Sequence, residues 1–218
     1  MQPTDLRADA ARNREKILRI AREQLNNGDT SLAMNVIARQ AGVGVGTVYR
    51  HFPTRQVLLE TLAMSSFEQL LGHARAAAAE ADPRTGLRNL LTAALVCLLD
   101  DAGLVAVLRS PQCACTETSQ LQVELLGALG RLLERAREVG AIRPDIRADD
   151  LRRYLLGLEQ AVRLGSREQD QIRRDLEVLL LGLQPHLHNQ LPASAPIGSH
   201  GGRMIGSSSS AACSSAGR

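Results

Sequence analysis

The residues best suited to chemistry lie close together in a segment that reads V-G-T-V-Y-R-H-F, Val45–Phe52. In a helix Val48 and Phe52 are four residues apart and face the same side, towards a core. The polar side chains between them then face outward: Thr47, Tyr49, Arg50 and His51. The forked guanidinium of Arg50 suits two hydrogen bonds to guanine, and Thr47 offers a methyl group for thymine and a hydroxyl for phosphate. These residue types indicate contact with the major groove of DNA.

The start of this segment also suits a close approach to nucleic acid. Gly46 has no side chain, so the helix can lie close to the groove, and we include Val45 beside it in the predicted contact surface.

A second short helix precedes the segment and positions it. V-I-A-R-Q-A places Val36, Ile37 and Ala41 on one face, and Gly42 ends the helix with the left-handed conformation that caps the last carbonyl groups. Val43 then folds back onto the apolar face. Two short helices joined by a tight glycine turn form a helix-turn-helix, whose second helix fits the major groove.

The stretch A-G-V-G-V-G-T-V-Y-R-H-F-P-T-R-Q-V-L resembles the TetR family of bacterial transcriptional regulators. The resemblance lies in the frame Tyr49-x-His51-Phe52-x-x-Arg55-x-x-Leu58 and covers about the first quarter of the chain. It implies that Tyr49 and His51 touch the DNA backbone, that Arg55 contacts a phosphate, and that Asn35 reaches a base or the backbone. A residue-based alternative for Tyr49 is packing of its ring against the first helix.

The sequence departs from the family pattern just before the second helix. Members usually place Ser or Thr there, where the hydroxyl caps the helix and meets a phosphate, but this chain has Leu32-Ala33. Ser31 is the nearest hydroxyl, so one phosphate contact is in question. Three arginines near the first helix have two open interpretations, a solvated face or contact with phosphate or the minor groove: Arg7, Arg12 and Arg14.

Charge and length agree with a DNA-binding module joined to a larger body. Residues 1–65 carry nine Lys or Arg against six Asp or Glu, and residues 66–188 carry fifteen against seventeen. The positive excess therefore lies with the helix-turn-helix and supports nucleic-acid binding. A chain of 218 residues with 44% hydrophobic content can bury a substantial core.

We expect an all-α fold of about nine helices. Residues 1–54 form a three-helix DNA-binding domain, residues 55–188 a helical domain for effector binding and dimerisation, and residues 189–218, rich in Ser, Gly and Ala, a disordered tail. The helices are expected at 11–26, 33–41, 45–52, 55–81, 83–99, 103–108, 119–139, 148–164 and 167–188. An S-x-x-Q capping box at Ser166 predicts the start of the last helix.

Catalytic and metal-binding patterns are absent from the sequence. Asp100-Asp101 and Asp149-Asp150 read as charges near helix ends, and His186-x-His188 would need further ligands to hold a metal. We therefore predict no enzyme, no cofactor and no metal. Two alternatives to a ligand-responsive repressor stay open: a thiol redox switch through Cys113 and Cys115, and a helical non-regulatory adaptor.

The partners follow from the same features. Double-stranded DNA is the expected partner of the head, as a palindromic operator bound by a homodimer that forms through residues 148–188. Aromatic residues make up only 2% of the chain, so the effector, which the sequence does not identify, is expected to be apolar and aliphatic rather than planar. No apolar run reaches the about 20 residues that span a bilayer, and no signal peptide is apparent, so we expect no membrane partner and a cytoplasmic location.

Overall fold

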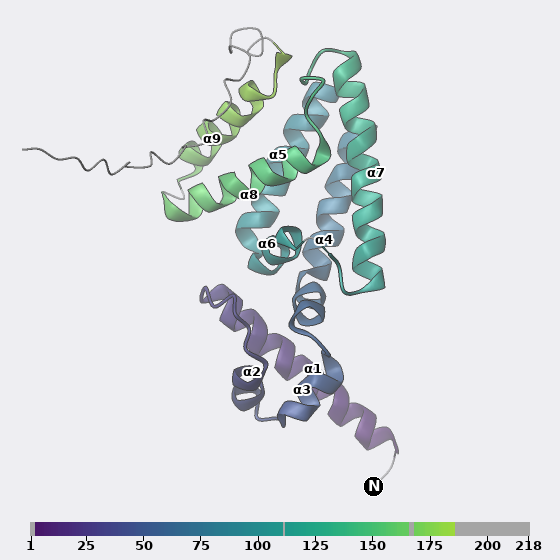
Figure 1. The fold of residues 1–218 in the computed structure, drawn as a ribbon, viewed down its shortest axis with the longest axis vertical. Coiled ribbons are helices and arrows are strands. Elements are labelled where there is room, and N and C mark those ends of the chain that lie inside the picture. The colour runs from purple at the N-terminus through teal and green to yellow at the C-terminus, as the bar shows by residue number, and fades with distance from the viewer. Residues whose placement is uncertain (1–2, 111, 166–167, 186–218) are drawn as a thin grey trace, which may run out of the picture.

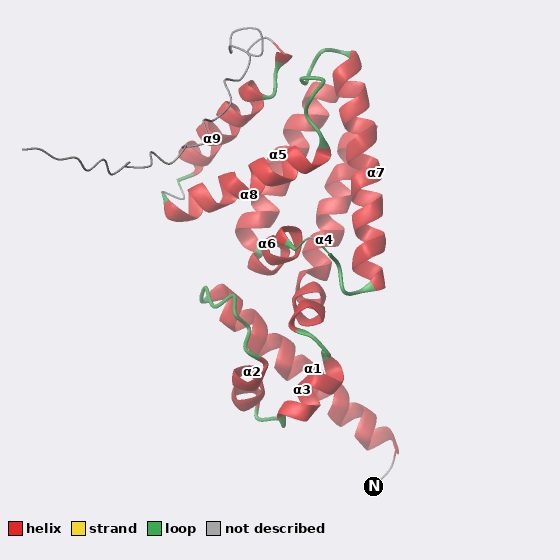
Figure 2. Ribbon diagram, viewed as in Figure 1, coloured by secondary structure: helices red, strands yellow, loops and turns green. Residues whose placement is uncertain are grey.

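The computed structural model describes residues 3–110, 112–165 and 168–185, and in these ranges the chain is helical with no strand (Figures 1 and 2). The helices, in chain order, are α1 (Pro3–Asn26), α2 (Met34–Ala41), α3 (Val45–His51), α4 (Arg55–Ala79), α5 (Pro83–Asp100), α6 (Ala102–Arg109), α7 (Thr116–Glu138), α8 (Ala148–Leu164) and α9 (Gln169–Gly182). The predicted all-α fold is confirmed. The predicted tail, 189–218, and the His186-x-His188 pair lie outside the described residues.

Helices α1, α2 and α3 form a head around a small core. Ile17, Ile37 and Val48, one from each helix, are fully buried. Gly42 has φ 67 and ψ 34, and Val43 N donates to Ala38 O at 3.0 Å, so the predicted left-handed cap and the fold-back of Val43 are confirmed. The predicted place of Val36 on the buried face is wrong, because the buried residues of α2 are Met34, Ile37, Ala38 and Ala41.

The first helix begins at Pro3, eight residues before the predicted start at Ala11, so the expectation of fraying is wrong for residues 3–10. Residues 7–14 are Ala, Arg, Asp and Asn without a helix breaker between them, and Ala and Arg are strong helix formers. They carry the helix beyond its apolar stripe, which was the signal used to place its start.

Local capping explains where the body helices begin. The Thr54 hydroxyl accepts from Val57 N at 3.2 Å at the start of α4, and Asp82 accepts from Arg84 N and Thr85 N at 3.1 Å at the start of α5. Asp101 caps α6 in the same way, as expected for a charge near a helix end. Each of these starts was predicted within one residue.

The start of α7 and both ends of α9 differ from the prediction. Helix α9 begins at Gln169 after Glu168 as its N-cap, so the expected start at Arg167 is wrong, and Ser166 of the capping box lies outside the described residues. It ends at Gly182 rather than near 188, because Pro185 disfavours helix at the residues before it. Helix α7 begins three residues earlier than predicted, directly after Cys115.

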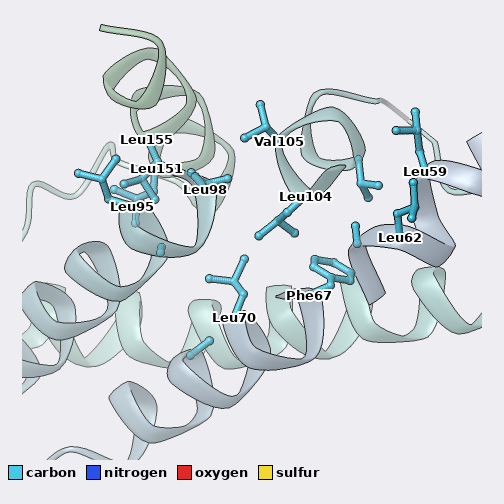
Figure 3. Packing of buried hydrophobic residues seen from close by; sticks show 14 of the residues in the cluster. Leu59, Leu62, Phe67, Leu70, Leu95, Leu98, Leu104, Val105, Leu151 and Leu155 are labelled. Carbon is cyan, nitrogen blue, oxygen red and sulfur yellow. The ribbon is translucent and has the colours of Figure 1, made fainter. Parts of the chain in front are cut away.

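The body is a packed bundle in which α4 contacts α5, α6 and α7 (Figure 1). Leucines from several helices meet in one cluster with Phe67 of α4, as Figure 3 shows for Leu70, Leu95, Leu98, Leu104 and Leu151. Helix α4 starts beside the head and continues through this cluster, so it is the physical connection between head and body. Among the described helices, none is by itself long and apolar enough to cross a membrane; α5 and α6 satisfy that test only as a pair, and they are bent by 109°.

Candidate nucleic-acid interface and ligand cavity

Helix α3 has one buried face and one face that is open to solvent. Val48 and Phe52 are 0% and 1% exposed, which fixes the orientation of the helix on the head. On the other side Arg50 is exposed and Tyr49 is 49% exposed, and neither side chain has a hydrogen bond or ion pair within the described residues. At 49% exposure more of Tyr49 than its hydroxyl reaches solvent, so the alternative in which the whole ring packs against α1 is not supported.

The remaining predicted contact residues of α3 surround Arg50. Thr47 and His51 are half-buried, and Val45 is 43% exposed. The His51 ring lies 6.3 Å from the Phe52 ring, tilted by 48°, which orients it at the end of the helix. A Cβ atom added to Gly46 would meet no atom within 4 Å, so packing within the protein does not require glycine there. This leaves close approach to a partner as a reason for glycine at position 46.

The first turn of α2 presents Asn35 to solvent. Its Oδ1 accepts from Val36 N at 2.9 Å, and its amide nitrogen is left for an external acceptor. The N-cap, Ala33, supplies no side-chain hydrogen bond, and the Ser31 hydroxyl donates to Asp29 at 2.6 Å instead of capping the helix. The phosphate contact that a capping hydroxyl gives in the family is therefore missing from this chain's geometry.

Arg55 differs from the exposed residues of α3 because it forms hydrogen bonds within the protein. Its Nε donates to Ser31 O at 2.8 Å and its Nη2 donates to Thr30 O, so the guanidinium holds the loop between α1 and α2 against the start of α4. The Nη1 group and the second hydrogen of Nη2 are left for a phosphate contact. Sequence reasoning assigned Arg55 only to DNA and missed this anchoring, which joins residues about 24 positions apart in the chain.

The three arginines of α1 divide into different environments. Arg14 stacks over the Phe52 ring at 5.5 Å from its centroid, a cation–π contact between α1 and the end of α3. Arg12 pairs with Asp9 on the helix surface, and Arg7 is exposed. Arg14 thus has a packing role that the sequence did not reveal, while Arg7 keeps the solvated and phosphate-contacting interpretations.

The body contains a cavity of about 260 Å³ between α4, α5, α7 and α8. Its wall is almost entirely aliphatic, with Leu70, Leu91, Leu98, Leu125 and Leu155 among the lining residues, and no aromatic side chain lines it. Three residues with polar side chains also line it: Gln122, Asp149 and Arg152. The size and lining suit an aliphatic molecule better than a planar one that needs ring stacking.

The same three polar residues also line a second hollow of about 280 Å³. Phe67, Ser110 and Cys113 are among the other residues that line this hollow. Arg152 donates from Nε and Nη2 to Asp149 at 2.9 and 2.6 Å and from Nη1 to Leu108 O at 2.6 Å. The Cys113 thiol donates to Gln122 Oε1 at 3.1 Å. These side chains offer both donors and acceptors to a polar group on an otherwise apolar ligand. None of them was predicted, because residues from α6, α7 and α8 meet only in the folded chain.

Glu60 of α4 is a buried carboxylate that sequence reasoning missed. It is 1% exposed and accepts from Ala114 N at 2.7 Å, Cys115 N at 2.8 Å and Gln56 at 2.8 Å. Burial opposes its charge, but these hydrogen bonds outweigh burial, and the pKa of Glu60 lies below its usual value. A charged residue next to Leu59 on an apolar helix face was the available signal.

The Glu60 carboxylate also affects the two thiols of the alternative redox switch, Cys113 and Cys115. Burial and the nearby Glu60 charge raise the pKa of the Cys113 thiol, and they raise the pKa of Cys115 to about 11. Both thiols are then protonated at neutral pH, and the thiolate is the reactive form. The environment of Cys113 and Cys115 therefore disfavours a redox switch. Within the described residues no group of three or more His, Cys, Asp or Glu could hold a metal ion.

A three-helix head with a solvent-facing recognition helix, joined by one long helix to a helical body, defines a helix-turn-helix regulator. Residues 17–62 match the family described as bacterial regulatory proteins, tetR family, and residues 82–185 match the C-terminal domain described as transcriptional regulator SbtR-like. The chain belongs to the TetR family of bacterial transcriptional regulators. These are regulators and not enzymes.

Individual relatives agree with this assignment. An HTH-type transcriptional regulator of Staphylococcus aureus is 33% identical over 69 residues, which is 31% of this chain and 37% of that protein, so the chain spans only about a third of the curated relatives it matches. Two solved structures share the fold. A TetR-family regulator from Shewanella is 19% identical, with a TM-score of 0.56 over 79% of this chain and 98% of the other. A ketosteroid transcriptional regulator of Mycobacterium tuberculosis is 19% identical, with a TM-score of 0.56 over 78% and 94%.

Proposed function

We propose that this protein is a repressor that binds a palindromic operator as a homodimer and releases it when an aliphatic molecule occupies the cavity in the body. The observation that carries the proposal is the outer face of α3. There Arg50 and Tyr49 are exposed and form no hydrogen bond or ion pair with the part of the chain that the structure describes, while the buried Val48 and Phe52 fix the opposite face of the helix. Arg50 reads a guanine in the major groove, and Thr47, Tyr49 and His51 hold the helix on the backbone.

A dimer through residues 148–188 is supported by apolar side chains that the isolated chain leaves exposed. Val178 and Leu181 of α9 are 70% and 53% exposed, and Leu164 and Tyr154 of α8 are 81% and 44% exposed. Scattered exposed apolar residues are normal, but this group lies on two adjacent amphipathic helices. A two-fold dimer presents two copies of α3, and a palindromic operator mirrors that symmetry.

Release requires a ligand to favour one spacing of the two heads over the other. A ligand shifts an equilibrium only by its differential affinity for the two states, commonly about 1–3 kcal/mol. Leu70 on α4 lines the cavity, and the same helix begins at Arg55 beside the head. Helix α4 thus carries a change in the cavity to the recognition helices.

DNA selection from random oligonucleotides tests the operator part of the proposal. Wild-type protein is expected to enrich one inverted repeat, and Arg50→Ala is expected to enrich it less, with the preference relaxed at one base pair of each half-site. Failure to enrich any sequence would contradict the proposed operator binding.

Matched valine variants test the dimer. Val178→Glu on α9 is expected to give monomers in sedimentation experiments. Val123→Glu is the control, because Val123 is equally exposed at 71% but lies on α7, outside the proposed interface. Dissociation by Val123→Glu alone would move the interface to α7.

Native mass spectrometry of the purified dimer, followed by operator-release assays with any small molecule that co-purifies, tests the ligand part. An aliphatic ligand that lowers operator affinity is the expected result. A ligand that fills the cavity without changing operator affinity would contradict ligand-controlled release, even with DNA binding established.

A further inference from the structure

A separate cleft of about 540 Å³ lies at the junction of head and body. The head supplies its wall from the end of α1, the following loop and the start of α4, with Asn26, Thr30 and Arg55. The body supplies α6 and α8, with Arg109, Glu159 and Arg163. None of its lining residues belongs to the aliphatic cavity described above.

The charges in this cleft do not balance. Of its lining residues, Arg55, Arg109 and Arg163 are positive and only Glu159 is negative. Glu159 is 1% exposed and pairs with both body arginines, Arg109 at 3.3 Å and Arg163 at shorter range. One carboxylate thus pairs with two guanidinium groups and offsets only one of their two charges, and among the described residues Arg55 bonds to the carbonyl groups of Thr30 and Ser31, which carry no charge. The cleft carries an excess of two positive charges.

The arginines keep part of their donor capacity. The Arg109 side chain is 50% exposed, and its recorded bonds, to Glu159 and to Gln160 Oε1 at 3.2 Å, both come from Nη2. Each guanidinium has five N–H donors in a planar fork that matches the oxygens of a phosphate group. Three residues with polar side chains also line the cleft, Asn26, Thr30 and Ser110, although the Ser110 hydroxyl donates to Gln112 O at 2.9 Å.

We propose that this cleft binds the dianionic phosphate group of a small molecule. A phosphate monoester carries about −1.5 to −2 charges at pH 7, which matches the excess of two positive charges. Arginine binds phosphate through paired charge-assisted hydrogen bonds, and Leu25, Val105 and Ala106 give the rest of the ligand an apolar wall.

A ligand in this position contacts both the head and the body. The two regions already touch near it, since α1 of the head contacts α6 of the body. A phosphate held by Arg55 on one side and Arg109 on the other would fix the angle between them. This effect on the angle rests on the proposed function as an operator-binding repressor, but phosphate binding itself does not.

Titration with inorganic phosphate at constant ionic strength, followed by the Nε–H resonances of the arginine side chains in NMR spectra, tests binding in the full-length protein. Saturable shifts at Arg55, Arg109 and Arg163 are expected. Arg109→Gln is expected to weaken binding about tenfold, as for the loss of one charge-assisted hydrogen bond. Arg131→Gln removes an exposed arginine of α7 that does not line the cleft, and it should leave binding unchanged.

Glu159→Gln is expected to change phosphate affinity in the direction opposite to Arg109→Gln. It removes the one negative charge of the cleft and is expected to strengthen phosphate binding, and the Arg109 and Arg131 variants decide the question if it does not fold. Absence of saturable shifts, or equal weakening by Arg109→Gln and Arg131→Gln, would overturn the proposed site. Phosphate binding with unchanged operator affinity would keep the site and reject its effect on the head.

Discussion

The head and the body use arginine in different ways. In the body, Arg135 of α7 donates to the carbonyl oxygens of Ala78, Glu80 and Ala81 at 2.7, 2.7 and 3.0 Å. Arg163 of α8 donates to the carbonyls of Leu98 and Leu99 at the end of α5. In the head, Arg50 on α3 has no such acceptor among the described residues.

The difference follows from what each region leaves unsatisfied. The last carbonyl groups of a helix have no partner within the helix, and inside a bundle water reaches them poorly. The body satisfies them with arginines from neighbouring helices, which also fixes how the helices pack. The donors of Arg50 are instead kept for an external acceptor. Arg55 is the exception, because it belongs to the region next to the DNA-binding surface but bonds to loop carbonyls as a body arginine does.

The largest expected effect on folding is from Arg135→Ala, which leaves three carbonyl groups at the end of α4 without their donor. We expect a loss of about 2–3 kcal/mol in the free energy of unfolding. Urea unfolding at a fixed protein concentration measures it, with Arg131→Ala on the same helix as the control. Equal stability of the two variants would contradict the difference proposed between head and body, in which body arginines stabilise the fold by donating to helix-end carbonyl groups.

Glu60→Gln is expected to cost about 2 kcal/mol at pH 7, because an amide accepts less strongly than a carboxylate from Ala114 N and Cys115 N. The pKa of Glu60 is lowered in the folded protein, so its stabilisation is present above the unfolded pKa and is lost as pH falls through the folded pKa. The difference between wild type and variant should therefore shrink below about pH 4.

Urea unfolding from pH 7 to pH 3 measures this difference. Glu68→Gln, at an exposed position on the same helix, is the control and should show no such trend. A stability difference that is independent of pH would show that the Glu60 carboxylate is not ionised in the folded protein.

Arg50→Ala is expected to weaken binding to the specific operator by about 1–3 kcal/mol and to relax the preference at one base pair. Unfolding should change by less than about 0.5 kcal/mol, since no intramolecular contact is lost. Binding to specific and random DNA is measured side by side. Equal losses on both would show that Arg50 contacts the backbone and not a base.

Arg55→Ala is expected to lower the free energy of unfolding by about 1 kcal/mol through the loss of its bonds to the loop. A phosphate contact through Nη1 would in addition weaken all DNA sequences alike and lower the salt slope of binding by about one. Salt titrations separate the two effects. An unchanged slope with reduced stability would place Arg55 entirely with the structural arginines of the body.

Gly46→Ala is expected to have a small effect on folding, opposite in sign to those of Arg135→Ala, Glu60→Gln and Arg55→Ala. The added methyl group meets open space, and Ala is favoured over Gly within a helix by about 0.5–1 kcal/mol. Operator affinity should nevertheless fall if the α3 backbone approaches DNA closely. Gly72→Ala on α4, which also meets no atom within 4 Å, should raise stability without changing DNA binding.

The sequence predicted most of what depends on neighbouring residues. Gly42 ends a helix, and Thr54 and Asp82 each begin one, through hydrogen bonds that span two to five positions. Gly is a favoured residue type after the end of a helix, and Thr and Asp are favoured at the start. The spacing of Val48 and Phe52 likewise predicted which face of α3 is buried. The start of α1 was missed because a stretch of helix without an apolar stripe carries no periodic signal.

The rest depends on contacts between distant parts of the chain. Glu60 meets Ala114 and Cys115 across 54 and 55 positions, and Arg135 meets Ala78 across 57. No local pattern identifies such partners. The residues that line the cavity could not be predicted either, because a leucine that lines it and a leucine in the core have the same spacing along the helix.

The scarcity of aromatic residues has an optical consequence. The chain has two tyrosines and no tryptophan. Tyr49 lies on the exposed face of α3 and Tyr154 on the exposed face of α8, at 49% and 44% exposure. Intrinsic fluorescence therefore arises from one phenol ring on each of the two proposed contact surfaces. Tyr154→Phe leaves an emission signal that responds to DNA, and Tyr49→Phe leaves one that responds to subunit association, so the molecule needs no attached dye to report either event.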